Sequence, residues 1–123
     1  MSESAVLKNI MLSCCRGAVR LWRNNVGALK DKNGVWIRYG VCNPGGSDLI
    51  GYRSVKVTPE MVGSTLAVLA CIEVKAPGGR LRPEQSQFLS AVQAAGGLAG
   101  VARSPEEAAA ILDALPARQA PPL

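Results

Sequence analysis

The strongest constraint on the fold is a nearly uninterrupted apolar run, residues 65–75, which ends in Glu73-Val74-Lys75. The residues that follow it, Ala76-Pro77-Gly78-Gly79, are typical of a turn and stop the run. An apolar run of this length between turn signals favours a central strand that is buried on both faces. We therefore predict a strand over residues 65–75.

Helical spacing of apolar residues predicts a first helix over residues 4–16. Gly17 does not end this pattern, because Ala18, Val19, Leu21 and Trp22 continue it. Pro83 in a first turn and Gly96-Gly97 after the end predict a helix over residues 83–95. The capping sequence Ser104-Pro105-Glu106-Glu107 predicts a last helix to residue 115, followed by a frayed tail over residues 116–123.

Shorter β signals lie between the predicted helices. Asp31-Lys32-Asn33-Gly34 has the chemistry of a hairpin turn, and residues 23–27 form a turn or a short strand. Further short strands are expected over residues 35–39, 48–52 and 98–102, and one helical turn over residues 58–63. This order of elements predicts the α/β class, with a mixed β-sheet flanked by α-helices.

Size and composition restrict the broad class of protein. A chain of 123 residues with 48% hydrophobic residues is the size of one domain with a real core, which we place over residues 1–115. No apolar stretch is long enough to cross a membrane, and residues 1–10 lack the apolar run of a signal peptide. We therefore expect no membrane partner.

Histidine is absent, which excludes Ser-His and Cys-His catalysis and imidazole zinc sites. The four cysteines form no C-x-x-C pair, so we expect neither a disulfide scaffold nor a zinc site. We expect reduced thiols in a cytoplasm instead. They are Cys14, Cys15, Cys42 and Cys71.

Positive charge is concentrated in the first half of the chain. Residues 1–56 hold nine basic and three acidic side chains, a net charge of +6, within a total of +5. Such a basic half suggests a polyanion, most simply a nucleic acid, and the alternative is charge that serves solubility alone.

One constellation of residues can carry chemistry. Glu73 and Lys75 are two residues apart on a strand, so they project from the same face. Asp48 opens a second short strand after a glycine-rich loop, and it converges with Glu73 if the two strands pair. Two carboxylates and a backbone carbonyl are hard oxygen donors for Mg²⁺ or Mn²⁺. The alternative is an ion pair between Glu73 and Lys75 at the strand end.

Three segments resemble the VRR-NUC domain, a family of the PD-(D/E)XK nuclease superfamily. They are Gly46-Ser47-Asp48-Leu49-Ile50-Gly51, the stretch from Ile72-Glu73-Val74-Lys75 to Arg80-Leu81, and Pro83-Glu84-Gln85 with Phe88. The resemblance runs over residues 3–102 and is to the short stand-alone version carried by phages and prophages. Ser47 stands where the superfamily name has proline.

The resemblance implies a restriction-endonuclease-like fold and a role for each matching residue. Asp48, Glu73 and the Val74 carbonyl would be metal ligands, and Lys75 would be the catalytic lysine. Gln85 would orient the site, with Gln87 as the competing amide. Glu3 would reach the metal directly or through water, or it is simply a favourable acid at a helix N-terminus.

Basic residues predict DNA contacts that position the phosphates without reading sequence. Arg16, Arg20 and Arg23 share one helical face if the first helix extends that far. The segment Arg23-Asn24-Asn25 resembles the family's R-x-N segment, and Arg80 and Arg82 flank the loop after the catalytic strand. The alternative for each is a solvated basic face.

The resemblance thus implies a Mg²⁺- or Mn²⁺-dependent endodeoxyribonuclease without an organic cofactor. We expect a homodimer that acts on branched DNA, such as four-way (Holliday) junctions, in the cytoplasm of a bacterial host. Alternatives are a flap or nicking nuclease with the same site, a non-catalytic DNA-binding module, and a structural phage protein with a chance motif.

Overall fold

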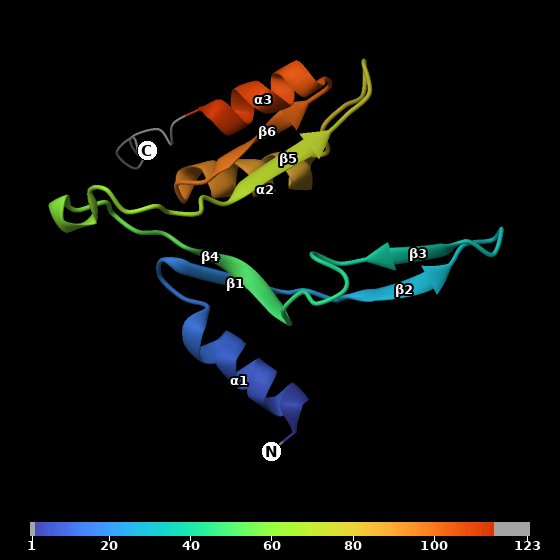
Figure 1. Ribbon diagram of the computed structural model, residues 1–123, viewed down its shortest axis with the longest axis horizontal. Coiled ribbons are helices and arrows are strands. Elements are labelled where there is room, and N and C mark those ends of the chain that lie inside the picture. Colours follow the sequence, from blue (N-terminus) through green and yellow to red (C-terminus); the bar gives the residue numbers. More distant parts are fainter. Residues whose placement is uncertain (1, 115–123) are drawn as a thin grey trace. The chain divides into compact units, whose positions relative to one another are not determined.

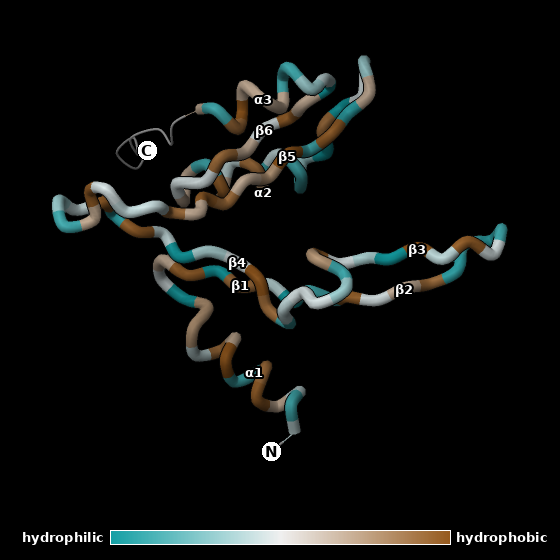
Figure 2. The backbone as a smooth tube through the Cα atoms, viewed as in Figure 1, coloured by the Kyte–Doolittle hydropathy of each residue, from teal (hydrophilic) through white to brown (hydrophobic). Residues whose placement is uncertain are grey.

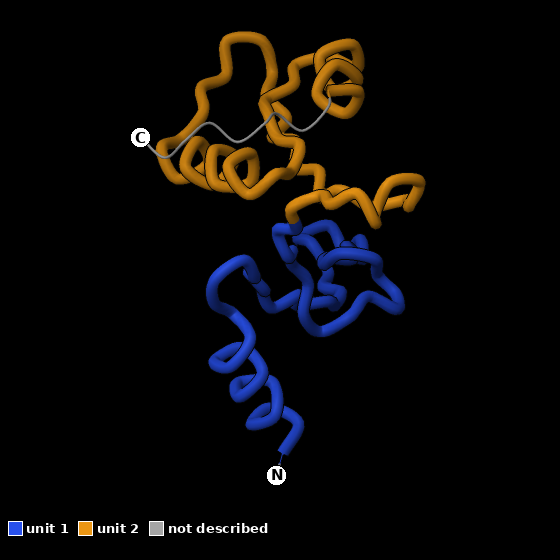
Figure 3. The backbone as a smooth tube through the Cα atoms, turned by 90° about the vertical axis from the view of Figure 1, so that its left-hand side faces the viewer, with its two compact units in different colours: residues 1–55 blue, residues 56–123 orange. Residues whose placement is uncertain are grey.

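The computed structural model describes residues 2–114, which divide between two compact units, residues 1–55 and residues 56–123 (Figure 3). The predicted end of the last helix at residue 115 and the predicted frayed tail lie outside the described residues. Helices, antiparallel strands and parallel strands are all present (Figure 1), so the predicted α/β class is confirmed. None of the helices within residues 2–114 combines the length and the apolar character that crossing a bilayer requires.

The first unit consists of one helix and two antiparallel strand pairs. Its elements are α1 (Glu3–Cys14), β1 (Val19–Arg23), β2 (Gly27–Lys30), β3 (Trp36–Tyr39) and β4 (Leu49–Arg53). Strand β1 pairs with β4, and β2 pairs with β3 in a hairpin. The β1–β4 pair approaches closely at Gly51, where a Cβ atom would collide with the carbonyl oxygen of Arg20.

Helix α1 ends at Cys14, two residues before the predicted end at residue 16, and the extension past Gly17 that the apolar pattern left open does not occur. Gly17 has a φ of +62°, and the backbone beyond it is the extended strand β1. The amide of Leu21 donates to Cys15 Sγ over 3.0 Å, which fastens the start of β1 to the helix end. The spacing of apolar residues alone could not decide between a longer helix and a strand after Gly17, because pairing with β4 is what makes this segment a strand.

The condition for a shared helical face of Arg16, Arg20 and Arg23, a longer first helix, is therefore not met. Arg16 lies in the turn after α1, whereas Arg20 and Arg23 belong to β1. Residues three apart on a strand point to opposite faces of the sheet, so these two arginines are separated. All three remain exposed.

The predicted hairpin turn is confirmed between β2 and β3. Asp31 Oδ1 accepts hydrogen bonds from the amides of Asn33 (2.8 Å) and Val35 (2.9 Å). Gly34 has a φ of +79°, a conformation that glycine adopts without steric cost. The turn residues therefore fix the hairpin register, in which Lys30 lies opposite Trp36.

The second unit is built around a parallel β-α-β arrangement. Its elements are a 3₁₀ turn (Pro59–Met61), β5 (Ala70–Val74), α2 (Pro83–Ala94), β6 (Leu98–Ala102) and α3 (Pro105–Asp113). Strands β5 and β6 run parallel, so their connection must cross the sheet, and α2 makes this crossover. Ser104 caps α3 by accepting a hydrogen bond at Oγ from the Glu107 amide over 3.1 Å, as its sequence predicts.

The core of the second unit lies between α2 and the parallel strands. Leu89, Val92 and Ala99 are buried, with Val92 only 1% exposed. Partly buried apolar residues pack against them from β5, β6 and the flanking loops: Leu69, Cys71, Leu81 and Val101. This core fixes α2 against β5 and so determines what α2 presents to the end of that strand.

The strand predicted over residues 65–75 is shorter than expected and is not buried on both faces. Strand β5 covers Ala70–Val74 only, its middle residues are half-buried, and Val74 is 74% exposed. Its partner β6 is also five residues long, and the paired register starts at Ala70 opposite Leu98. An apolar run shows that a segment can be a strand, but the length of the partner limits how much of it becomes one.

Candidate functional site

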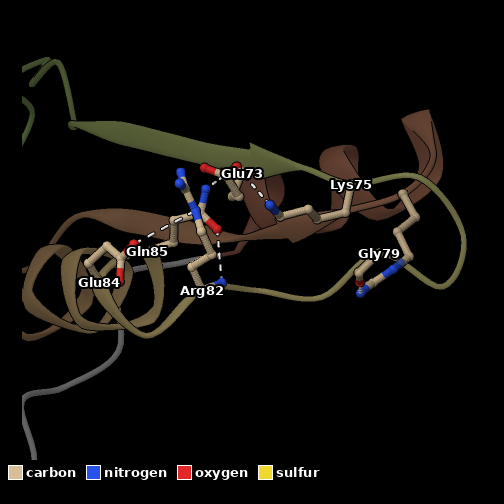
Figure 4. Close-up of polar contacts among 7 residues, drawn as sticks. Glu73, Lys75, Gly79, Arg82, Glu84 and Gln85 are labelled. Atoms are coloured by element: carbon tan, nitrogen blue, oxygen red, sulfur yellow. Dashed lines mark hydrogen bonds and ion pairs between the residues drawn. The ribbon is translucent and has the colours of Figure 1, made fainter.

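Three predicted site residues meet at the end of β5 (Figure 4). Gln85 Nε2 donates a hydrogen bond to Glu73 Oε1 over 2.9 Å, and Lys75 Nζ lies 3.5 Å from the same oxygen. Glu73 and Lys75 reach one face of β5 because they are two residues apart on the strand. Gln87, the competing amide, is exposed on α2 and does not take this place.

Gln85 is held by the helix that carries it. Its Oε1 accepts a hydrogen bond from the Arg82 amide over 3.0 Å, at the N-cap of α2, and Pro83 occupies the first turn. The side chain of a third helical residue that bonds back to the N-cap is one half of a capping box. The same side chain therefore caps α2 through its oxygen and holds Glu73 through its nitrogen.

The carboxylate of Glu73 is only partly enclosed. The Glu73 side chain is 32% exposed and the Lys75 side chain 18% exposed. Both contacts fall on Oε1, and among residues 2–114 the second oxygen, Oε2, has no further hydrogen bond or ion pair. A carboxylate with one oxygen held and the other accessible can receive a cation from solvent.

A shallow pocket of about 200 Å³ opens beside this group. Its lining comes from β5 and the first turns of α2: Cys71, Ile72, Glu73, Glu84, Gln85, Phe88 and Leu89. Burial raises the pKa of the Cys71 thiol. The lining thus combines apolar side chains with the hydrogen-bonded pair Glu73 and Gln85.

The donor set fits a hard divalent cation. The Glu73 carboxylate and the Val74 backbone carbonyl are oxygen donors, and oxygen is the ligand that Mg²⁺ and Mn²⁺ prefer. No histidine exists in the sequence to make a nitrogen site. Across residues 2–114, no three acidic or cysteine side chains gather into a cluster that could hold a metal.

Asp48 lies in the first unit, directly before β4, and is exposed. Its carbonyl oxygen accepts a hydrogen bond from the Asn24 amide over 2.8 Å, which continues the β1–β4 pairing by one step. Asp48 is thus placed where the loop of residues 41–48 enters the sheet. Its convergence with Glu73 stays a prediction.

Asn24 fastens the loop that leads to Asp48, and sequence reasoning missed it. The side chain is only 9% exposed. Its Nδ2 donates to the carbonyl oxygens of Val41 and Ser47, each over 3.0 Å, and its Oδ1 accepts from the Val41 amide over 2.9 Å. The conformation of this loop requires glycine at position 46, because a Cβ atom there would collide with the Val41 carbonyl oxygen. A single buried asparagine between two polar residues gives no signal in the sequence.

The remaining predicted residues are all exposed. Glu3 is the first residue of α1, and Asn25 follows β1. Arg80 and Arg82 lie in the loop between β5 and α2, close in the chain to Lys75 and Gln85. Arg82 Nε lies 3.8 Å from Glu84 Oε1 in an exposed ion pair, which leaves the guanidinium accessible.

A parallel β-α-β unit with an acid, a lysine and a glutamine at the end of one strand defines an α/β protein of the nuclease type. The family model of the VRR-NUC domain matches residues 7–106, so the chain belongs to the VRR-NUC domain family. No curated protein and no solved structure matches the chain significantly. Membership makes this a nuclease-type DNA-processing domain.

Proposed function

We propose that the chain is a Mg²⁺- or Mn²⁺-dependent endonuclease that hydrolyses phosphodiester bonds in branched DNA, four-way junctions above all. The observation that carries the proposal is the group at the end of β5, where Glu73 Oε1 receives both Gln85 Nε2 and Lys75 Nζ. A plain strand-end ion pair would not need an amide from a neighbouring helix. The added contact from Gln85 supports the interpretation that the Glu73 carboxylate is held in a fixed orientation for a ligand.

Each residue has a separate part in the proposed reaction. The carboxylates of Asp48 and Glu73 and the Val74 carbonyl hold the cation, and Glu3 adds a ligand directly or through water. When bound, a divalent cation supplies charge to a phosphate oxygen and lowers the pKa of a water molecule. Lys75 stabilises the negative charge that develops on the phosphate as water attacks. Gln85 keeps Glu73 oriented.

The DNA is held by exposed basic and polar side chains on both units. They are Arg16, Arg20, Arg23, Asn25, Arg80 and Arg82. Guanidinium groups bind phosphates as planar forks and carry no sequence preference, which suits a nuclease that recognises structure. We further propose that the protein is a homodimer, because two copies of the site suit paired cuts across a four-way junction. A phage- or prophage-encoded origin and a place in the bacterial cytoplasm remain expectations from the resemblance.

The test is cleavage of four-way, flap, nicked and linear DNA of matched sequence, with Mg²⁺, with Mn²⁺ and with EDTA. We expect cleavage of the four-way junction with either cation and none with EDTA, and loss of cleavage in Asp48→Asn. Lys56→Ala, which removes an exposed lysine outside the site, is the matched control and should cleave as the unchanged protein does. Preferred cleavage of flaps or nicks would replace the junction assignment. Binding without cleavage under any metal would overturn the proposal.

A further inference from the structure

The β2–β3 hairpin has two chemically different faces. Directly opposed residues of an antiparallel pair lie on the same face. Ala28 opposite Arg38 and Lys30 opposite Trp36 therefore make one face basic and aromatic. Leu29 opposite Ile37 belongs to the other face. Figure 2 shows hydrophobic and hydrophilic residues following one another along both strands.

We propose that the face formed by Lys30, Trp36 and Arg38 binds DNA that has unpaired bases. Lys30 and Arg38 contact phosphates, and the Trp36 ring stacks on an exposed base. The inference rests on the proposed function and extends it, because it assigns a substrate-contacting element away from the group at the end of β5. It also names what that element recognises, the unpaired bases of a single-stranded arm such as a flap or an overhang.

Trp36 is unusually accessible for its type. The residue is 65% exposed, whereas the other tryptophan, Trp22, is 38% exposed and lies against Tyr52 with ring centroids 5.7 Å apart. Aromatic rings in contact with solvent are the platforms on which single-stranded bases stack. Trp36 is thus placed for stacking, and Trp22 is not.

The charges on this face are arranged for a polyanion. Lys30 Nζ lies over the Trp36 ring, 5.3 Å from its centre, so a cation and an aromatic ring are side by side on this face. Within residues 2–114, neither Lys30 nor Arg38 forms an ion pair with an acidic side chain. Asp31 is the nearest acid in the chain, and one of its carboxylate oxygens accepts hydrogen bonds from the turn amides of Asn33 and Val35. The face therefore carries positive charge that is not neutralised by the fold.

Tryptophan fluorescence gives a direct test. In Trp22→Phe, Trp36 is the single tryptophan, and a duplex with a single-stranded overhang should quench its emission when EDTA prevents cleavage. A blunt duplex and a four-way junction should quench it less, because all their bases are paired. Trp36→Phe, which leaves Trp22 alone, serves as the matched protein and should keep its emission. Unchanged Trp36 emission at saturating DNA would overturn the inference.

Salt dependence tests the two cations. Each phosphate contact contributes about 0.9 to the slope of log affinity against log salt for duplex DNA and about 0.7 for a single strand. The double variant Lys30→Ala/Arg38→Ala should therefore bind the duplex with a single-stranded overhang with a slope shallower by about 1.5. Removal of two other exposed lysines, Lys8→Ala/Lys56→Ala, makes the same change in net charge and should leave the slope unaltered.

The outcomes separate this inference from the proposed function. If the unchanged protein neither binds nor cleaves any DNA, the proposed function fails. If it cleaves DNA while the Trp36 emission and the salt slope stay unaffected, only the hairpin assignment fails. A change in oligomeric state in Trp36→Ala, measured by sedimentation, would instead make the hairpin an interface between two copies of the chain and would overturn the DNA assignment.

Discussion

Gln85 donates a hydrogen bond from Nε2 to Glu73 Oε1 over 2.9 Å, while its own Oε1 accepts from the Arg82 amide at the start of α2. One side chain therefore links the geometry of a helix end to the orientation of the carboxylate on β5. The helix cap uses the oxygen of the Gln85 amide, and the contact with Glu73 uses its nitrogen. A substitution at residue 85 can therefore remove one of the two hydrogen bonds and keep the other.

Gln85→Glu keeps the oxygen that accepts from the Arg82 amide but loses the donor to Glu73. The new carboxylate repels that of Glu73, so the free energy of unfolding is measured at high salt, where this repulsion is screened and the value should stay close to that of the unchanged protein. Cleavage should fall by about 10- to 100-fold, the usual effect of losing a residue that orients a metal ligand. Urea unfolding and single-turnover cleavage measure the two quantities.

Gln85→Ala is the companion variant, because it removes both hydrogen bonds. It should lose about 1 kcal/mol of unfolding free energy, as expected for a lost helix cap, together with activity. Equal stability loss in Gln85→Glu and Gln85→Ala at high salt would contradict the division of roles between the two amide atoms.

Lys75→Ala should lower kcat by about 10²–10³-fold, because it removes a positive charge placed to act on the transition state. The KM for DNA should change little, since one internal lysine adds little to binding by many phosphate contacts. Steady-state cleavage of the preferred substrate separates kcat from KM. A variant that cleaves as well as the unchanged protein would exclude Lys75 from the chemistry.

The sequence contained enough to predict the elements around the site. Its turn and capping residues are local signals, so the hairpin turn at Asp31 and the cap at Ser104 are confirmed by hydrogen bonds within a few residues. The E-x-K pattern likewise put Glu73 and Lys75 on one face of a strand, because strand geometry alone determines it.

What the sequence could not supply depends on contacts between distant segments. Val19–Arg23 has a helical pattern of apolar residues, yet it is a strand because it pairs with Leu49–Arg53. The strand over residues 65–75 was predicted too long for the same reason, since β6 determines where pairing begins. Asn24 was missed because its partners, Val41 and Ser47, are 17 and 23 residues away.

Asn24→Ala should cost about 2 kcal/mol of unfolding free energy, because it removes three part-buried hydrogen bonds to the backbone of Val41 and Ser47. Hydrogen exchange should rise in residues 41–48, and cleavage should fall because Asp48 is carried by that loop. Asn25→Ala, which changes the exposed neighbour, is the control for stability and should unfold as the unchanged protein does. Slow exchange at the Val41 amide in Asn24→Ala would show that the loop does not depend on Asn24.

Arg82→Ala should weaken DNA binding without a loss of stability. The helix cap uses the backbone amide of residue 82, which alanine retains, and exposed ion pairs such as Arg82–Glu84 contribute little. The slope of log affinity against log salt should become shallower by about 1. Glu84→Gln breaks the same ion pair but keeps the arginine, so weaker binding in that variant would indicate that the ion pair, and not a phosphate contact, is what Arg82 supplies.

Titration of the protein with Mn²⁺, followed by calorimetry, tests the central claim most directly, because it asks whether Asp48 and Glu73 serve one cation. Both Asp48→Asn and Glu73→Gln keep the size of the side chain and remove the charge. The account predicts that each single variant weakens Mn²⁺ binding by at least about 10-fold and that the double variant is little worse than either, since ligands of one ion are not additive. Mn²⁺ binding that survives Asp48→Asn unchanged, or that falls by the full product of both effects in the double variant, would contradict it.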